Sequence, residues 1–231
     1  MPDGDNSIRP RLTRRSDKKF HDFPRPTLAV DTALLTVDLS RNQLMVVEMA
    51  RADTGKWALP GTFVRERETL AEAVGRCLKE KLGVRGVRPR QLQVFDDPDR
   101  DPRDWVISVA HVAVVRPEQL DALGGGTAST TRLAPVDRPG ELSWDHPAIV
   151  RLAKEYVRDR YEAGPDPERL LGPRFTLSEL KRVHEAVLGV DEIDRFQFRR
   201  VMKPLIVGTG VMTESTGGRP AELYRRATDR D

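Results

Sequence analysis

The chain lacks several features that would place it in a specialised class of protein. It has a single cysteine, Cys77, which excludes a disulfide bond within the chain and fits a reducing compartment. No run of residues approaches the roughly 18 apolar residues of a membrane-spanning helix, and no signal-peptide core follows the first residue. The net charge is only +3, so the charge balance alone does not identify a nucleic-acid binder. We therefore expect a cytoplasmic protein that does not associate with membranes.

The remaining composition is that of an ordinary globular protein. The 231 residues are 38% hydrophobic and 32% charged, which suits one domain of ordinary size and a small second one. The distribution of charge is more informative than its sum. Residues 1–26 carry clustered arginines and lysines with few apolar anchors, which predicts a flexible basic arm.

Apolar periodicity predicts an α+β fold. A helix is expected at 69–82, where apolar residues recur every three or four positions and Gly83 supplies a common helix end. A further helix is expected at 147–161. With the strands, these helices predict an α/β/α sandwich over residues 27–162. The expected strands are rich in Val, Leu and Ile and lie at 27–39, 43–51, 91–95 and 105–115.

The last quarter of the chain has a different character. Residues 163–173 contain prolines and glycines and predict a linker. Thr176 and Glu179 then form a capping-box pattern that opens a helix. A second helix, at about 191–203, mixes basic residues with apolar ones that compete for the core. A hairpin-like segment follows, so residues 174–228 predict a winged helix-turn-helix domain. The competing apolar residues are Phe196, Phe198 and Met202.

A damaged catalytic motif lies between Leu59 and Val84. This segment resembles the Nudix box, G-x5-E-x7-R-E-U-x-E-E-x-G-U with U a bulky aliphatic residue. Hydrolases with this box cleave nucleoside diphosphates linked to another group. Thr62 replaces the glycine of the box, and Cys77 and Lys81 replace two of its glutamates. The matching positions are Glu68, Arg76, Leu78, Glu80, Gly83 and Val84.

The damage falls on the residues that would bind metal. Positions 77, 80 and 81 lie within one helical turn, and in the working family glutamates there hold divalent cations through carboxylate oxygens. Only Glu80 keeps a carboxylate. The Cys77 thiol is a poor ligand for Mg²⁺, and Lys81 brings a positive charge to the place of the cation. We predict no catalytic residues, no bound metal or cofactor and no enzymatic activity.

Two other interpretations of this motif stay open at this point. The helix with Glu72, Arg76 and Glu80 is also compatible with a solvated face of paired charges. Alternatively, Glu68 and Glu80 still hold a metal with help from other loops. The protein would then be an active pyrophosphatase on ADP-ribose or NADH.

The basic helix and the hairpin predict DNA binding. Arginine and glutamine make paired hydrogen bonds to guanine and adenine edges, and arginines beside a glycine-rich tip suit phosphate or minor-groove contacts. A basic helix by itself is more often only a solvated face, but the arginines of the hairpin favour DNA binding. The predicted DNA-binding residues are Arg195, Gln197, Arg199, Arg200, Lys203, Thr209, Arg219 and Arg225.

Several short segments, in order and spacing, resemble the NrtR family of Nudix-related transcriptional repressors. The resemblance covers nearly the whole chain after residue 22, and it implies a homodimer that represses genes of NAD synthesis or salvage. It also implies binding to a palindromic double-stranded operator and release by ADP-ribose. The matching segments are 23–26, 59–65, 97–105, 175–180, 198–200 and 218–225.

The same resemblance implies an effector pocket in the Nudix-like domain. Guanidinium groups pair with phosphate, and an aromatic ring offers a stacking face to adenine. Trp105 has a second interpretation as a core residue, and a related repressor that senses another nucleotide or a sugar stays open. The expected ligand-binding residues are Arg25, Phe63, Arg65, Arg76, Glu80, Lys81, Arg100, Asp101 and Trp105.

Overall fold

The computed structural model describes residue 19 and residues 22–124, 130–214 and 220–229. Most of the basic arm expected at 1–26 lies outside these ranges. Within them, none of the helices has the length and apolarity needed to cross a membrane.

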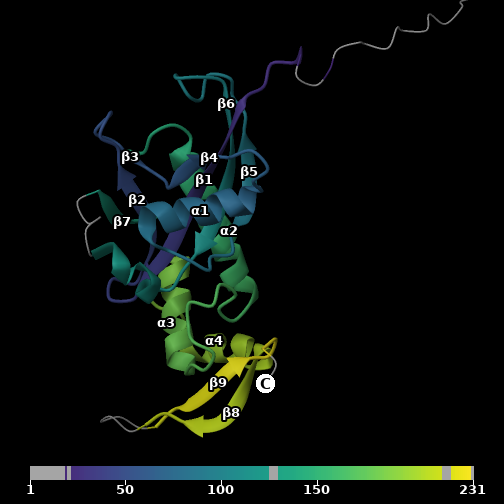
Figure 1. Ribbon diagram of the computed structural model, residues 1–231. Helices are drawn as coiled ribbons and strands as arrows, with labels where there is room; N and C mark the ends of the chain where they lie inside the picture. Colours follow the sequence, from purple (N-terminus) through teal and green to yellow (C-terminus); the bar gives the residue numbers. More distant parts are fainter. Residues whose placement is uncertain (1–18, 20–21, 125–129, 215–219, 230–231) are drawn as a thin grey trace, which may run out of the picture.

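The larger part of the molecule is built on a seven-stranded mixed sheet (Figure 1). Its main path runs β3-β2-β1-β6-β5, with β4 paired to β1 and β7 paired to β2. The central pair, β1 and β6, is parallel, and the other pairs are antiparallel. The strands are β1 (Thr27–Asp38), β2 (Gln43–Ala50), β3 (Trp57–Ala58), β4 (Gly61–Phe63), β5 (Arg90–Phe95), β6 (Val106–Val114) and β7 (Thr131–Pro135).

The four strands expected from sequence are present, each with ends within one residue of the prediction. The three strands that were not expected, β3, β4 and β7, are two to five residues long. Such short strands carry too few residues for an alternating pattern, and they are held by pairing with β1 and β2.

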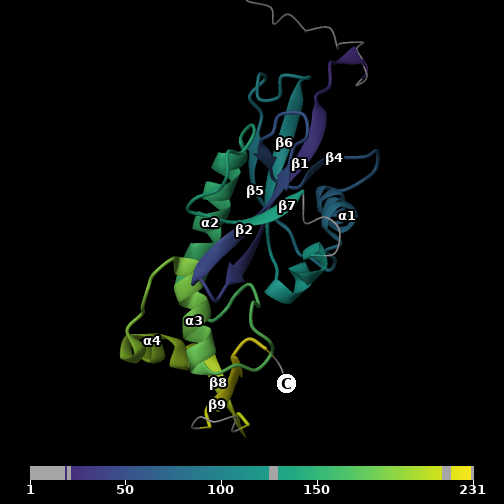
Figure 2. The same ribbon diagram turned by 90° about the vertical axis from the view of Figure 1, so that its left-hand side faces the viewer.

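Helices cover both faces of this sheet (Figure 2). One face carries α1 (Leu70–Leu82) and the 3₁₀ helix η2 (Pro117–Gly124), and the other carries α2 (His146–Ala163). Helix α1 begins at a complete capping box between Thr69 and Glu72 and ends at Gly83, whose φ is 69°. The α/β/α sandwich expected from sequence is therefore confirmed.

Strand β1 shows how the two faces are filled. Val30 and Leu34 pack against α1, whereas Ala33, Leu35 and Val37 belong to the core under α2. Alternate residues of a strand point to opposite faces, so a strand covered on both sides is apolar throughout.

The smaller part contains α3 (Leu177–Leu188), α4 (Arg195–Met202), the 3₁₀ helix η3 (Lys203–Leu205), and the antiparallel pair β8 (Ile206–Met212) and β9 (Glu222–Arg226). The capping box of Thr176 and Glu179 opens α3 as predicted. A small core joins the helices to the hairpin, which confirms the winged helix fold. This core contains Phe175, Leu180, Phe198, Met202, Ile206 and Tyr224.

One expected core residue is not in the core. Phe196 is 82% exposed, while Phe198 and Met202 are buried. Residues four apart share a helix face, so Phe198 and Met202 already fill the inward face of this eight-residue helix. The helix also begins later than expected, because the Asp194 side chain accepts a hydrogen bond from the Gln197 amide and caps it there.

Helix α3 belongs to both cores. Leu180 lies in the winged-helix core, whereas Val183, Ala186 and Val187 pack into the core between the sheet and α2. Arg158 of α2 donates a hydrogen bond to the Val187 carbonyl oxygen at 3.0 Å. The two parts of the molecule are therefore connected by shared packing.

The segment 163–173, expected to be a linker, is packed as well. Asp166 is fully buried and accepts hydrogen bonds from the Tyr161 hydroxyl at 2.6 Å and from the amides of Leu170 and Leu171, both at 2.8 Å. It also forms an ion pair with Arg226 of β9. This buried carboxylate ties the end of α2 to the hairpin.

Candidate functional site

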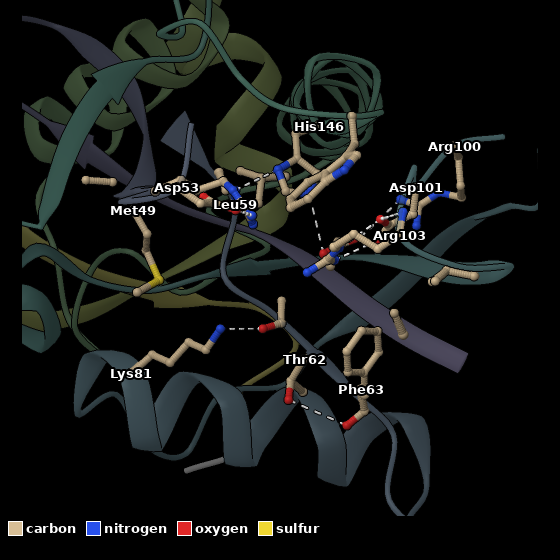
Figure 3. Close-up of a pocket in the computed structure, with 18 of the residues that line it drawn as sticks. Met49, Asp53, Leu59, Thr62, Phe63, Lys81, Arg100, Asp101, Arg103 and His146 are labelled. Carbon is tan, nitrogen blue, oxygen red and sulfur yellow. Dashed lines mark hydrogen bonds and ion pairs between the residues drawn. The ribbon is translucent and has the colours of Figure 1, made fainter. Parts of the chain in front are cut away.

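A cavity of about 560 Å³ opens where β1, β4, the end of β2, the C-terminal half of α1 and the start of α2 meet (Figure 3). Its size falls within the range of small-molecule binding sites. The polar and aromatic residues that line it are Asp31, Arg51, Asp53, Thr62, Phe63, Lys81, Arg100, Asp101, Arg103, Trp144 and His146.

A glycine at position 61 allows two strands to approach at the base of the cavity. Gly61 on β4 pairs with Asp31 on β1. A Cβ atom at residue 61 would lie 2.1 Å from the Asp31 Oδ1 atom and 3.1 Å from the Val30 carbonyl oxygen. Because only glycine lacks that atom, Gly61 is required for the Asp31 carboxylate to occupy its place.

Asp31 is the centre of a buried polar network. Ser108 donates a hydrogen bond to its Oδ2 atom at 2.6 Å, and the Arg100 Nη2 atom lies 3.4 Å from the same oxygen. The His146 Nδ1 atom accepts a hydrogen bond from the Leu59 amide at 2.9 Å, which leaves the proton on Nε2, 3.4 Å from Asp31 Oδ1. Burial raises the pKa of Asp31, but His146, Ser108 and Arg100 outweigh it, and the net pKa is lowered. Asp31 therefore stays ionised.

Four cationic side chains surround the cavity, and several are held by acidic partners. Arg103 donates to Asp101 at 2.8 and 2.7 Å, and Arg100 donates to Asp145 at 2.6 Å. Arg51 pairs with Asp53. These pairs fix guanidinium groups at the cavity wall, where an anionic ligand would meet them.

An aromatic ring lies among these cations. The Trp144 ring centroid is 4.2 Å from the guanidinium carbon of Arg51 and 5.3 Å from that of Arg103. It also stands edge-on to His146 at 5.2 Å. The wall therefore offers a flat stacking surface beside positive charge, a combination that suits a base and a phosphate group.

The remaining residues of the box are engaged with one another. Arg76 donates to both oxygens of Glu68, at 2.7 and 2.8 Å, and to the Phe63 carbonyl oxygen at 2.9 Å. This pairing lowers the pKa of Glu68 to about 2. Glu80 lies 3.7 Å from Arg76 and 3.8 Å from Arg65, on the exposed side of α1.

The residues that replace the box glutamates do not fit a divalent cation. Cys77 is 1% exposed, and burial raises the pKa of its thiol to about 11, so it is neutral and unsuited to Mg²⁺. The Lys81 ammonium points into the cavity and donates to the Gly61 carbonyl oxygen at 2.6 Å (Figure 3). Among the described residues, no three or more His, Cys, Asp or Glu side chains come together as a metal site.

The structure brings four of the nine expected ligand residues to the cavity wall: Phe63, Lys81, Arg100 and Asp101. Five others do not line it. Arg65, Arg76 and Glu80 form the ion pairs of the box instead, and Arg25 is exposed on the approach to β1. Trp105 precedes β6 and is 42% exposed, so it is not a core residue.

Sequence reasoning missed seven polar or aromatic residues of the wall. They come from β1, from the residues after β2, from β4, from the loop before β6 and from the start of α2. The tripeptide 144–146, polar and aromatic at the start of a helix, is a signal that was available. The missed residues are Asp31, Arg51, Asp53, Thr62, Arg103, Trp144 and His146.

The expected DNA-binding residues fall into two groups. Arg195, Gln197, Arg199 and Arg200 are exposed on α4. Arg219 lies outside the described residues. The other three form hydrogen bonds within the domain. Lys203 donates to the Tyr224 hydroxyl at 3.0 Å, Thr209 donates to the Leu223 carbonyl at 2.8 Å, and Arg225 donates to the Asp229 carbonyl at 2.5 Å.

Comparison with known families agrees with this architecture. Residues 27–156 match the model of the NUDIX domain, so the chain belongs to the Nudix family. Residues 167–226 match the model described as the NrtR DNA-binding winged helix domain. The combination places the chain in the NrtR group of that family, as the sequence resemblance predicted.

Three relatives illustrate the likeness. The chain is 29% identical over 218 residues to the ADPR responsive transcriptional repressor NtrR of Acinetobacter baylyi, covering 89% of this chain and 84% of the relative. A crystal structure of Shewanella oneidensis NrtR with a 27mer DNA is 31% identical, with a TM-score of 0.71 and coverage of 86% and 93%. An ADP-ribose pyrophosphatase of Methanocaldococcus jannaschii is 32% identical over 147 residues, which is 64% of this chain and 82% of the relative.

Proposed function

We propose that this chain is a transcriptional repressor of genes for NAD biosynthesis or salvage, released from DNA by ADP-ribose. It acts as a homodimer on a palindromic operator. One observation carries the proposal: a cavity lined by cations and an aromatic ring lies in a Nudix fold whose core shares α3 with a winged helix. The relatives described as an ADP-ribose-responsive repressor and as a DNA complex support the same assignment.

Effector sensing and DNA binding are assigned to the two different parts of the fold. Residues 27–162 form the sensor and residues 174–228 bind DNA, with 1–26 as a basic arm and 163–173 as the connection. The exposed side chains of α4, Arg195, Gln197, Arg199 and Arg200, contact the operator.

In the sensor, ADP-ribose fills the cavity. Arg51 and Arg103 pair with its diphosphate, and Trp144 or Phe63 stacks on its adenine. Lys81 occupies the place of a metal-binding glutamate and neutralises phosphate charge in the cavity without a cation. The pairing of Glu68 and Glu80 with arginines supports binding without turnover.

ADP-ribose acts by favouring one arrangement of the dimer. A ligand shifts an equilibrium only when it binds the two states with different affinity. The effector must therefore bind best to the state in which the two α4 helices do not match the operator spacing. Helix α3 carries that change, because it packs in both cores.

The deciding experiment measures DNA binding and hydrolysis in one preparation. Fluorescence anisotropy follows the full chain on duplex DNA from upstream of NAD-synthesis genes at fixed salt, with and without ADP-ribose. Scrambled duplex, NAD and ribose 5-phosphate serve as controls. We expect tight binding that ADP-ribose releases. Operator affinity unchanged by ADP-ribose would show that the effector assignment is wrong.

A second candidate function is favoured by the 32% identity to an ADP-ribose pyrophosphatase. The same preparation, incubated with ADP-ribose and Mg²⁺ or Mn²⁺, is assayed for AMP. Steady metal-dependent AMP release without preference for any DNA sequence would establish the enzyme and overturn the repressor.

A further inference from the structure

The surface of α4 contains a large, highly exposed apolar side chain among charged and polar ones. Phe196 is 82% exposed, and no other exposed large hydrophobic side chain among the described residues exceeds 52%. Helical geometry places residue 196 opposite the buried pair Phe198 and Met202. Arg199 and Arg200, three and four residues further on, share its outward face.

Single exposed apolar residues are common on protein surfaces, so exposure alone is weak evidence of a role. The surroundings of Phe196 are more specific. A phenyl ring stands on the outward face of the helix that the winged-helix fold presents, directly among the exposed cations of that helix. A surface with this charge fits a polyanion, so the ring would be brought against nucleic acid when the cations meet phosphate.

The chemistry of the major groove then limits what the ring can contact. Most groups at the base edges are hydrogen-bond donors and acceptors, which a phenyl ring cannot satisfy. The C5-methyl group of thymine is the apolar exception, and phenylalanine is among the side chains that contact it. Phe196 is therefore suited to thymine and indifferent to the hydrogen-bonding edges that arginine and glutamine recognise.

We propose that Phe196 is a specificity residue that reads a thymine methyl group in each operator half-site. This inference rests on the proposed DNA-binding function. It assigns the apolar part of recognition to Phe196 and leaves charge and hydrogen bonding to Arg199, Arg200 and Gln197. In a symmetric dimer the same contact occurs twice, at equivalent thymines.

The test removes the methyl group from DNA and the ring from the protein. The full-length wild type first selects duplexes from a random pool, and each thymine of the selected half-site is then replaced by uracil. We expect one position at which uracil weakens wild-type binding about fourfold per half-site, the equivalent of burying one methyl-sized group. Phe196→Ala should bind the thymine and uracil duplexes equally, which makes the two changes non-additive.

Val201→Ala is the matched control. Val201 is on the same helix and 47% exposed, and it lies on the flank next to the buried face. This variant should keep the full sensitivity to uracil. Both variants should melt at the wild-type temperature, because neither side chain is in a core.

The possible outcomes distinguish a failure of the thymine contact from a failure of the proposed DNA-binding function. If no duplex is enriched, DNA binding by the chain is contradicted and the inference falls with it. If duplexes are enriched but uracil affects wild type and Phe196→Ala equally, only the thymine contact is wrong. If Phe196→Ala instead weakens self-association in sedimentation experiments with DNA affinity per dimer unchanged, the ring belongs to a contact between copies of the chain.

Discussion

The Lys81 ammonium donates a hydrogen bond to the Gly61 carbonyl oxygen at 2.6 Å, at the edge of the cavity that contains the ionised Asp31. A positive charge is therefore fixed where the Nudix box has a metal-binding glutamate. Gly61 itself is required by the close approach of Asp31. A single contact thus links the altered box to the geometry of the cavity base.

This contact predicts effector binding that needs no metal. The affinity for ADP-ribose, measured by calorimetry, should be the same in EDTA and in Mg²⁺. Lys81→Met should lower it about tenfold, because a charge-assisted hydrogen bond to phosphate is lost. Lys79→Met, an exposed lysine of the same helix outside the cavity wall, should have no effect. A strong loss of ADP-ribose binding by the wild type in EDTA would contradict this prediction.

Cys77 should be unreactive in the folded protein. Burial raises the pKa of its thiol from about 9 to about 11, so the thiolate that reacts is about a hundredfold scarcer than in an exposed cysteine. Mass spectrometry after iodoacetamide treatment at pH 8 should find it unmodified in buffer and modified in urea. Rapid alkylation without denaturant would contradict the burial of Cys77.

His184 should make the protein sensitive to mild acid. Its ring packs edge-on between Tyr161 and Phe198, and burial lowers its pKa from 6.5 to about 4. Between these values the unfolded chain binds a proton that the folded chain does not. The free energy of unfolding should therefore fall as the pH drops from 6.5 towards 4, by on the order of 3 kcal/mol in total, and level off below.

Urea unfolding of the wild type and His184→Leu at several pH values checks this. The variant lacks the titrating group, so its pH dependence in this window should be shallower than that of the wild type. The two should have parallel profiles above pH 7. Equal slopes between pH 4 and 6.5 would show that the ring is accessible to protons in the folded state.

Removing Arg226 should destabilise the protein strongly. The change Arg226→Met leaves the Asp166 carboxylate buried without its ion-pair partner, which costs about 3–5 kcal/mol. Arg169→Met is the control, because Arg169 is 61% exposed and its pair with Asp229 should contribute less than about 1 kcal/mol. Denaturant unfolding measures both. A cost for Arg226→Met as small as that of Arg169→Met would mean that water reaches Asp166.

The parts of the fold set by neighbouring residues could be predicted from sequence. The capping box of Thr176 and Glu179 located the start of α3, and Gly83 located the end of α1. The replacement of two box glutamates by Cys77 and Lys81 could be identified because the spacing of the box is fixed along one helix. Each of these signals spans a few residues, and local periodicity is sufficient to detect it.

The cavity wall could not be predicted in the same way. The contact between Leu59 and His146 joins residues 87 positions apart, and that between Asp31 and Ser108 joins residues 77 apart. Pairings of this kind are set by the order of strands in the sheet. Phe196 shows a related failure: its apolar side chain suggested burial, but the inward face of α4 was already filled.

The shared helix α3 has a consequence for genetics. Its residues Val183, Ala186 and Val187 touch the sheet core, while Leu180 on the same helix supports the surface that carries α4. A selection for variants that stay bound to the operator when effector accumulates should therefore return changes in α3. Such variants would keep normal affinity for each ligand measured alone, and the energetic link between the two sites is what they would have lost.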